Sequence, residues 1–302
     1  MKILNYGSLS LDFTYLVDHF VTAGETITTS GLSVNYGGKG LNQSLAVRRA
    51  GMPVFHTGKI GSDGLCLKSF LKENGVNTEF LGEGDFMNGQ AIIQLAPDGQ
   101  NCIFLYPGSN HENTEDEVGK CLSVFGPGDI LMLQNEINLI PYIIDMAFEK
   151  GMEIVLNPSP ITPELINEYP LGKVSMFILN EVEGRDLTGF DEPGKILGAL
   201  NKKYPAAKVL LTLGSLGAIY SDGEKIIKHG VYSSDVVDTT AAGDTMAGYF
   251  IGCLGLGFSV EKALKYASIA ASIAISRKGA SPSIPTMTEV EKSRLKYIDT
   301  GI

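Results

Sequence analysis

The amino-acid sequence predicts an α/β protein in which helices cover both faces of a mostly parallel sheet. The first observation is a set of short, nearly all-apolar runs, typical of strands that are buried on both faces: residues 2–6, 129–133, 153–156, 176–179 and 209–212. The second is a set of segments with helical periodicity between these runs, among them residues 40–50, 65–73, 140–150 and 195–203. This alternation indicates parallel strands joined by right-handed crossovers.

Two β-rich segments depart from the alternation. Residues 12–36 and 89–106 carry alternating β-branched and aromatic side chains without a helical period. The second segment has an Asp98-Gly99 turn between two apolar runs, which is typical of a β-hairpin. We expect the two segments to form a small sheet that acts as a lid over a site. No linker, low-complexity segment or repeat is found, so residues 1–302 are expected to form one domain.

The composition is that of a globular protein with a large core, because 44% of the residues are hydrophobic and 19% are charged. The formal net charge is −10 and the pI is about 4.9. Proteins that bind nucleic acid usually present a basic patch, and no run of Lys or Arg here could make one. We therefore expect neither nucleic acid nor an anionic membrane as a partner.

The cysteines and the apolar segments are typical of a cytoplasmic protein. Four cysteines form no CxxC pair and have no histidine cluster nearby, so neither a zinc site nor a disulfide framework is expected: Cys66, Cys102, Cys121 and Cys253. The longest apolar stretch, residues 246–258, is shorter than the roughly 20 residues that span a bilayer, and it predicts a buried helix. Residues 1–7 reach Gly too early for a signal peptide.

The segment 238–245, with the sequence DTTAAGDT, carries the strongest chemical signal. It follows the strand-like pair Val236-Val237 and precedes the apolar helix, and small residues at 241–243 would let a ligand approach the backbone. Free amides at a helix start bind phosphate, and Asp244 in the first turn could take a proton from an attacking hydroxyl. Taken alone, Asp244 is explained equally well as a first-turn acid that suits the helix dipole.

A glycine-rich turn, NYGGKGLNQ at 35–43, runs into a predicted helix. Its glycines permit close backbone approach, and Lys39 and Asn42 can offer hydrogen-bond donors to a polyol. The spacing is not that of a Walker A loop, because Gly40 follows Lys39. As a lone glycine-rich turn, the segment would be weak evidence for a site.

Two further polar segments follow strand-like runs. Asn180 and Glu183 would share one face of a first helical turn and could hold a hydrated magnesium ion, although they could equally form a capping box. Residues 212–217, TLGSLG, suit a loop around a nucleotide, although a tight turn between strands would look the same. The carboxyl ends of parallel strands face the ligand crevice of an α/β sheet, so both segments are expected near one site.

Together these motifs resemble those of the ribokinase-like carbohydrate kinases, the PfkB family, and among them the ribokinases most closely. The likeness covers residues 3 to 285. GGKG-x-N-Q at 37–43 and DTTAAGD at 238–244 match the two family signatures, NEVE at 180–183 and TLGSLG at 212–217 match the magnesium and nucleotide elements, and GETI at 24–27 falls in the lid. The resemblance implies a three-layer α/β/α fold with a mostly parallel central sheet and a small β-sheet lid.

The resemblance also implies a role for each matching residue. Asp244 corresponds to the general base, and the backbone amides of Ala242 and Gly243, with Ala241 alongside, correspond to the anion hole. Glu183 is expected near magnesium, through water. The expected sugar-binding positions are Ser10, Asp12, Gly37, Gly38, Lys39, Asn42 and Glu136. The expected nucleotide-binding positions are Asn180, Thr212, Gly214, Ser215 and Gly217.

Ribokinases also bind an activating potassium ion beside the anion hole, and they commonly pair their lids into a dimer. The resemblance therefore implies ATP, magnesium and potassium as cofactors and a homodimer formed through the lid. The lid is expected to exclude water and so to limit ATP hydrolysis. The positions that match the potassium site, several of them through backbone carbonyls, are Asp238, Thr240, Ala274, Arg277, Gly279 and Ser283.

Two positions depart from the ribokinase pattern. Ser10 stands where the family usually has asparagine, two residues before the aspartate at Asp12. A shorter side chain reaches a sugar hydroxyl less well, or leaves room for a different substituent. Ser268 stands where ribokinases tend to have a histidine near the adenine, and only an effect on nucleotide affinity is expected.

The leading expectation is ATP-dependent phosphorylation of D-ribose to ribose 5-phosphate. The alternative is a kinase for another sugar or for a nucleoside, whose base would need an apolar slot that could include Tyr36, Ile103, Phe104 and Tyr106. A sugar phosphate would require more cations than Lys39, the one found at the sugar site. A non-catalytic sugar-binding protein is the remote alternative, which the presence of both the base and the anion-hole glycine disfavours.

Overall fold

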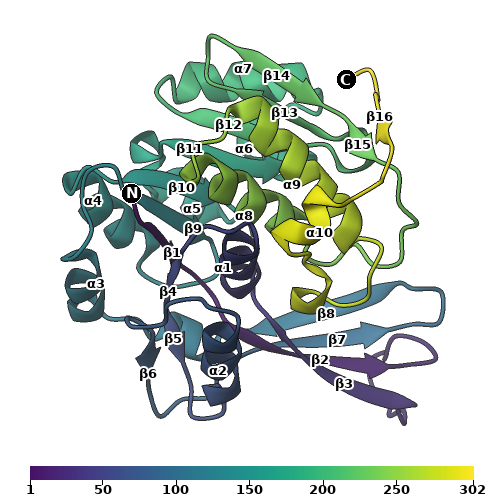
Figure 1. The fold of residues 1–302 in the computed structure, drawn as a ribbon. Coiled ribbons are helices and arrows are strands. Elements are labelled where there is room, and N and C mark those ends of the chain that lie inside the picture. Colours follow the sequence, from purple (N-terminus) through teal and green to yellow (C-terminus); the bar gives the residue numbers. More distant parts are fainter.

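The computed structural model describes all 302 residues and centres on an eight-stranded sheet (Figure 1). Its strands, in spatial order, are β14 (Ile226–His229), β13 (Ala218–Ser221), β12 (Lys208–Thr212), β11 (Met176–Asn180), β10 (Glu153–Asn157), β9 (Ile130–Gln134), β1 (Ile3–Tyr6) and β4 (Phe55–Thr57). The strands from β12 to β4 are parallel, whereas β13 and β14 pair antiparallel at one edge. The five apolar runs predicted from sequence are all strands of this sheet, each within one residue of its predicted ends.

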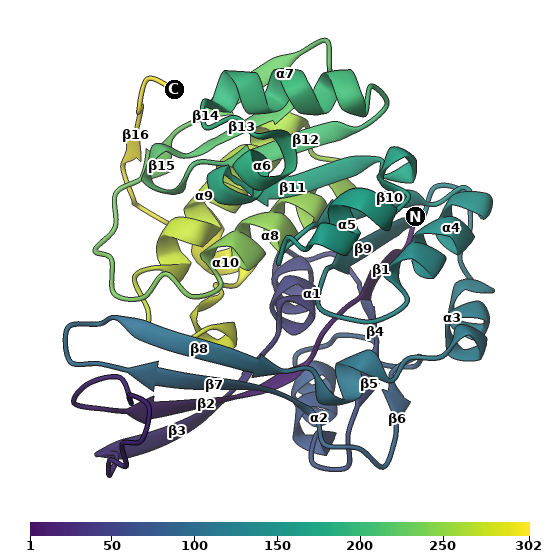
Figure 2. The same cartoon turned by 180° about the vertical axis from the view of Figure 1, so that it is seen from behind.

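Helices cover both faces of the sheet and complete three layers, as the two opposite views show (Figure 1 and Figure 2). One face carries α1 (Lys39–Arg49), α8 (Ala242–Gly255), α9 (Val260–Ala274) and α10 (Met287–Glu291). The other carries α3 (Glu115–Leu122), α4 (Ile140–Glu149), α5 (Pro163–Glu168), α6 (Glu181–Thr188) and α7 (Pro193–Lys203). Neighbouring strand residues such as Met132 and Leu133 point to opposite faces and belong to different apolar clusters, which is why these strands are apolar throughout.

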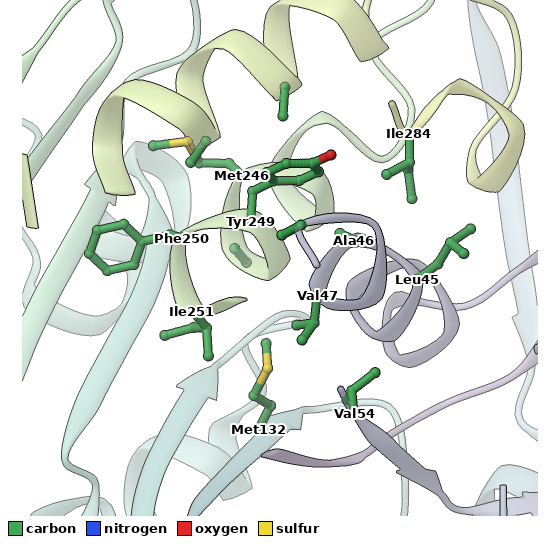
Figure 3. Close-up of a cluster of buried hydrophobic side chains, with 14 of the residues drawn as sticks. Leu45, Ala46, Val47, Val54, Met132, Met246, Tyr249, Phe250, Ile251 and Ile284 are labelled. Carbon is green, nitrogen blue, oxygen red and sulfur yellow. The ribbon is translucent and has the colours of Figure 1, made fainter. Parts of the chain in front are cut away.

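A close contact between α1 and α8 lies on one face of the sheet (Figure 3). It depends on Gly248, because an added Cβ would lie 2.4 Å from Cβ of Ala46 and 2.6 Å from the carbonyl oxygen of Gln43. The helices bury apolar side chains around this contact, including Val47, Met246, Tyr249 and Phe250. Asp244 precedes Gly248 by one helical turn on the same face, so the contact also sets the distance from Asp244 to α1.

A second, four-stranded sheet projects from the main body (Figure 1). Its strands, in spatial order, are β3 (Gly31–Gly37), β2 (Ser10–Leu16), β7 (Gly89–Leu95) and β8 (Asn101–Tyr106). The hairpin predicted at Asp98-Gly99 is confirmed, with a φ of 84° at Gly99 and the amide of Ala96 donating to the carbonyl of Gln100 at 3.0 Å. Residues 17–30 form a loop rather than a strand, since the Glu25 carboxylate accepts the Thr22 amide at 3.0 Å and closes a turn.

The remaining elements are short, and their four strands form two further two-stranded sheets. They are β5 (Lys59–Ile60), α2 (Leu65–Glu73), β6 (Gly82–Glu83), η1 (Gly108–His111), η2 (Leu171–Lys173), η3 (Gly214–Leu216), β15 (Val231–Tyr232), η4 (Ser281–Ser283) and β16 (Tyr297–Ile298). The apolar stretch 246–258 lies largely within the buried helix α8, as predicted. None of the helices combines the length and the apolar character required to cross a membrane.

Polar residues gather at the carboxyl edge of the parallel sheet. Gln134 ends β9, Asn157 ends β10, Asn180 ends β11 and Thr212 ends β12. Gln134 lies opposite Asn157 in the sheet register, and Asn180 lies opposite Thr212. Ligands of open α/β sheets bind at this edge, which makes it the place to look for a site.

Candidate active site

Asp244 is held in the first turn of α8 by two side chains of α1. Its side chain is buried, with the residue 9% exposed. Nδ2 of Asn42 donates to Oδ2 of Asp244 at 3.1 Å, and Nε2 of Gln43 donates to Oδ1 at 3.0 Å. Each carboxylate oxygen has two lone pairs, so both can accept a further hydrogen bond. The arrangement presents a fixed carboxylate that can take a proton from a bound hydroxyl.

The backbone just before Asp244 offers free amide donors. Ala241 is the N-cap of α8 and has a φ of 60°, in the left-handed region that non-glycine residues seldom adopt. The amide of Ala242 donates to the carbonyl of Thr239 at 3.2 Å, whereas the amides of Gly243 and Asp244 have no backbone acceptor. A Cβ added to Gly243 would meet no atom within 4 Å, so the space beside it is open. Of the two predicted anion-hole amides, that of Gly243 is therefore free and that of Ala242 is engaged.

Lys39 lies among carboxylates at the start of α1. Its backbone amide donates to Oε2 of Glu136 at 3.1 Å, and the Ser8 hydroxyl donates to the same oxygen at 2.5 Å. Burial lowers the pKa of the Lys39 ammonium, but the carboxylates of Asp244, Glu136 and Glu183 outweigh burial and raise that pKa above its ordinary value. Burial raises the pKa of Glu136, while Lys39 and Ser8 act in the opposite direction. Lys39 thus supplies a persistent positive charge to the site.

Ser10 and Asp12 lie on one face of β2 and contact each other. The Ser10 hydroxyl donates to Oδ1 of Asp12 at 2.6 Å. Gly37 leaves room for this aspartate, because an added Cβ would lie 1.9 Å from Oδ2 of Asp12, and Gly38 has a φ of 94° that suits glycine. Burial raises the pKa of Asp12 to about 6; the hydrogen bond from Ser10 opposes the shift and the charge of Glu136 adds to it.

A cavity of about 1180 Å³ opens beside the start of α8 and is large enough for a nucleotide. Four of the predicted nucleotide-binding residues line it together with two anion-hole residues: Thr212, Gly214, Ser215, Gly217, Ala242 and Gly243. Ser268 lines it as well. Residues 212–217 make the turn between the antiparallel strands β12 and β13, and four of them line this cavity, so the turn remains compatible with the predicted nucleotide role.

Two walls of this cavity have no counterpart among the residues predicted from sequence. Residues 231–237 form one wall, and there the strand expected at Val236-Val237 is wrong. The amides of Val237 and Asp238 both donate to the carbonyl of Ile275, at 2.8 and 3.1 Å, so the end of α9 takes the donors that a sheet would use. The second wall comes from Ile298 and Thr300 near the C-terminus, and no local sequence signal marks them.

Asn180 and Glu183 form a capping box at the start of α6. The Glu183 amide donates to Oδ1 of Asn180 and the Asn180 amide donates to Oε2 of Glu183, each at 2.9 Å. Neither residue lines the cavity. Glu183 nevertheless lies close enough to Lys39 to raise its pKa, and no hydrogen bond occupies Oε1 of Glu183. The capping role therefore leaves one carboxylate oxygen available to a hydrated cation.

Asp238 joins two loops beside the anion hole. Its Oδ1 accepts the amide of Thr240 at 2.9 Å and the Thr240 hydroxyl at 2.6 Å, and its Oδ2 accepts the amide of Gly279 at 2.9 Å. Partial burial would raise the pKa of Asp238, but these hydrogen bonds outweigh it and lower the pKa below the ordinary value. An ionised carboxylate therefore ties residues 238–240 to residue 279.

The other predicted potassium-site residues lie between the end of α9 and η4, in the segment that contains Gly279. The Ala274 carbonyl at the end of α9 accepts the Arg277 amide at 3.0 Å. The Arg277 guanidinium pairs with Glu289 of α10 at 2.7 Å, so its charge is offset. The Ser283 hydroxyl donates to the Ala280 carbonyl at 2.7 Å. Carbonyl and hydroxyl oxygens are suitable ligands for a potassium ion.

The apolar residues considered for a nucleoside base do not form a slot. Tyr36 packs against Phe70 of α2, with ring centroids 5.2 Å apart. Ile103, Phe104 and Tyr106 lie on the edge strand β8, where every residue is exposed. These side chains therefore lie on the two opposite edge strands of the small sheet, β3 and β8.

No group of three or more His, Cys, Asp or Glu side chains is placed to hold a metal ion directly. Magnesium keeps most of its water shell and is commonly held by one or two carboxylates together with substrate phosphates. The free oxygen of Glu183 could bind a magnesium ion in this way, through water. The side chains present do not form a site that would hold a metal ion by protein ligands alone. A metal at this site would depend on the bound nucleotide.

Comparisons with known proteins agree with this arrangement. The model of the pfkB family carbohydrate kinases matches residues 1–287. The ribokinase of Haemophilus influenzae is 33% identical over 293 residues, which cover 94% of this chain and 95% of that protein. A crystal structure of ribokinase from Cryptococcus neoformans in complex with ADP has a TM-score of 0.83 and 34% identity, and covers 96% of this chain and 99% of that one.

The structure of Arabidopsis thaliana ribokinase complexed with ribose and ATP superimposes with a TM-score of 0.85 at 29% identity, covering 96% of this chain and 97% of that one. The likeness therefore extends over both sheets and is not confined to the two signature segments. Fold, motif order and site geometry all agree, and the chain belongs to the PfkB family of carbohydrate kinases.

Proposed function

We propose that this carbohydrate kinase transfers the γ-phosphoryl group of ATP to a hydroxyl of D-ribose and so forms ribose 5-phosphate. The observation that carries the proposal is the position of Asp244, buried at the start of α8 between the polar residues of α1 and the large cavity. A carboxylate at that junction can contact a sugar hydroxyl on one side while the phosphate chain lies on the other. The near full-length likeness to ribokinases supports D-ribose as the sugar.

In the proposed reaction, Asp244 takes the proton of the attacking hydroxyl. The hydroxyl oxygen forms a bond to the γ-phosphorus, the bond from that phosphorus to the β–γ bridging oxygen breaks, and ADP leaves with the bond's electron pair. The free amides of Gly243 and Asp244 and the dipole of α8 stabilise negative charge on the phosphoryl oxygens. Lys39 adds a positive charge on the same side.

The sugar is proposed to lie between β2 and the start of α1. Asp12, Glu136 and Asn42 supply acceptors there, and Oδ1 of Asn42 is buried without a hydrogen-bond partner. A sugar hydroxyl would satisfy that oxygen, which removes the cost of leaving it unpaired. Two carboxylates, one amide oxygen and the single cation Lys39 suit the hydroxyl groups of a neutral polyol.

Magnesium and potassium complete the proposal. Glu183 would hold magnesium through water, and the magnesium ion would neutralise charge on the nucleotide phosphates. Residues 238–240 and 274–283 would hold potassium through Asp238 and backbone carbonyls. We expect omission of potassium to reduce kcat, and equal kcat in potassium and tetramethylammonium buffers would remove potassium from the proposal.

A homodimer formed through the small sheet and a cytoplasmic location are also proposed. The edge strand β8 exposes Phe104 and Leu105 by 57% and 60%, and such unpaired apolar edges invite pairing with another strand. Light scattering after gel filtration measures the mass directly, and a monomer would exclude the dimer. The four unpaired cysteines agree with a reducing compartment.

Sugar affinity is expected to depend on the ionisation of Asp12. Because the pKa of Asp12 is raised to about 6, its carboxylate is ionised at pH 7 and mostly protonated at pH 5. Protonation removes acceptor capacity, so KM for the sugar should rise roughly tenfold from pH 7 to pH 5 while KM for ATP changes little. Steady-state kinetics across this range, with Asp12→Asn as the control, measure the effect. A sugar KM that is flat with pH in the native enzyme would contradict it.

The substrate itself is tested by ADP release with magnesium and potassium present. The panel contains D-ribose, 2-deoxyribose, other pentoses, hexoses and nucleosides, and each is tried with the native enzyme and with Ser10→Asn. We expect D-ribose to have the highest kcat/KM, and Ser10→Asn to raise it further because an amide reaches farther than a hydroxyl. A different best substrate whose advantage disappears in Ser10→Asn would identify Ser10 as the specificity switch and replace ribose in the proposal.

A further inference from the structure

A buried chain of polar side chains runs from Asp244 into the interior of the protein. The Gln43 amide has a partner at each end. Its Nε2 donates to Asp244, and its Oε1 accepts a hydrogen bond from Nε2 of Gln134 at 2.8 Å. Nε2 of Gln134 also donates to Oδ1 of Asn5 at 2.9 Å. Nδ2 of Asn5 in turn donates to the Ser44 hydroxyl at 2.9 Å. These residues come from three separate elements, α1, β1 and β9, which the fold brings together.

Hydrogen-bond partners separate the role of Gln43 from that of its neighbour Asn42. Both side chains are buried, with Asn42 5% and Gln43 2% exposed, and Gln134 is fully buried. Asn42 has an unpartnered oxygen and is proposed to bind the substrate. Both polar ends of Gln43 are instead engaged: its Oε1 accepts from the buried Gln134, and its Nε2 donates to Asp244 and lies 3.5 Å from Oδ1 of the partly buried Asn157.

The hydrogen bonds allow one orientation of the Gln43 amide. An ionised carboxylate only accepts hydrogen bonds, so Asp244 requires the NH₂ group of Gln43. The Gln134 NH₂ group has two protons, and it gives one to Asn5 and the other to Gln43. A reversed Gln43 amide would set oxygen against the Asp244 carboxylate and NH₂ against the NH₂ of Gln134. Gln134 therefore enforces the orientation in which Gln43 donates to Asp244.

We infer that Gln43 is a positioning residue that holds the Asp244 carboxylate in its reactive orientation, and that Gln134 locks Gln43 in place. The inference rests on the proposed role of Asp244 as the base. Asn42 and Gln43 each hold one carboxylate oxygen, so together they fix the rotation of the carboxyl group. Preorganisation of this kind favours the geometry of the transition state over other orientations and acts mainly on kcat.

The test replaces Gln43 by methionine, which has a similar length and no donor. We expect kcat to fall roughly 10- to 100-fold, the scale of losing a hydrogen bond to a charged group, with KM for sugar and ATP within about threefold of native. Gln134→Met, which leaves α1 unchanged, should lower kcat in the same direction by a smaller factor. If Gln43→Met does not fold, Gln134→Met alone decides the inference.

Two controls separate positioning from loss of stability. Ser221 lies in β13, far along the sheet from Asp244, and its buried hydroxyl accepts a hydrogen bond from Nδ2 of Asn201 at 3.0 Å. Ser221→Ala removes that hydrogen bond, so we expect a lower melting temperature and a native kcat. In an Asp244→Asn background, Gln43→Met should cause no further loss of turnover. The inference is overturned if Gln43→Met or Gln134→Met behaves like Ser221→Ala. If Asp244→Asn is itself active, the proposed base and the positioning role fall together; if it is inactive while Gln43→Met is fully active, only the positioning role falls.

Discussion

Replacing Asp244 by asparagine is expected to lower turnover by roughly 100-fold or more, because general base catalysis contributes on that scale. The amide has nearly the same shape as the carboxylate but cannot take the proton of the attacking hydroxyl. Asn42 and Gln43 both donate to this side chain, so the asparagine oxygen can keep one of the two hydrogen bonds. Folding and sugar binding should therefore persist. Coupled ADP release measures kcat, and calorimetric titration with D-ribose measures binding.

Glu136→Gln is the matched control for that experiment. Glu136 is another carboxylate beside Lys39, and it is proposed to contact the sugar without taking part in proton transfer. Its replacement should raise KM for the sugar more than it lowers kcat. Near-native kcat in a folded Asp244→Asn enzyme would refute the base assignment. A larger fall of kcat in Glu136→Gln than in Asp244→Asn would exchange the two roles.

Gly248→Ala is expected to affect stability and activity together. The added methyl group would lie 2.4 Å from Cβ of Ala46 and 2.6 Å from the Gln43 carbonyl, so α1 and α8 must move apart. Overpacking of this kind costs roughly 1–3 kcal/mol of unfolding free energy. The same movement draws Asn42 and Gln43 away from Asp244, and we expect kcat to fall roughly 10-fold or more. Urea unfolding and steady-state kinetics measure the two effects.

Gly198→Ala, in the helix α7, serves as the control for the helical effect of the substitution. A Cβ added there meets no atom within 4 Å, so the change should stabilise the protein by about 0.5–1 kcal/mol through helix propensity alone. Turnover should stay native. If Gly248→Ala instead resembles Gly198→Ala in both measurements, the α1–α8 contact does not set the position of the base.

Local sequence patterns predicted most of the fold and many of the groups at the site. The apolar runs form strands whose ends agree with the prediction to within one residue. A strand that is buried on both faces is apolar at nearly every position, so its ends are marked by the first polar residues on either side. The hairpin at Asp98-Gly99 followed from a turn that needs a positive φ. The start of α8 was visible in the small residues before Asp244. These features depend on residues close together along the chain.

Prediction failed where contacts between distant segments decided the outcome. Val236 and Val237 have high strand propensity, yet neither joins a sheet. The Ile275 carbonyl accepts the amides of Val237 and Asp238, and the two valines line the cavity. Gln43 lay within the glycine-rich signature, but nothing in that segment shows that its amide reaches Asp244, about 200 residues later in the chain. The cavity wall at Ile298 and Thr300 likewise has no local signal.

The sequence by itself determined the class of fold, the family and the chemical groups that gather at the sheet's carboxyl edge, because periodicity, turn chemistry and spaced motifs are local properties. Only the tertiary structure decided which groups meet. It placed α1 against α8 through Gly248, and so brought the two amide donors to the two oxygens of Asp244. The physical reason is that helix–helix contact distance and buried hydrogen-bond direction depend on pairs of residues far apart in the chain, and no single segment encodes them.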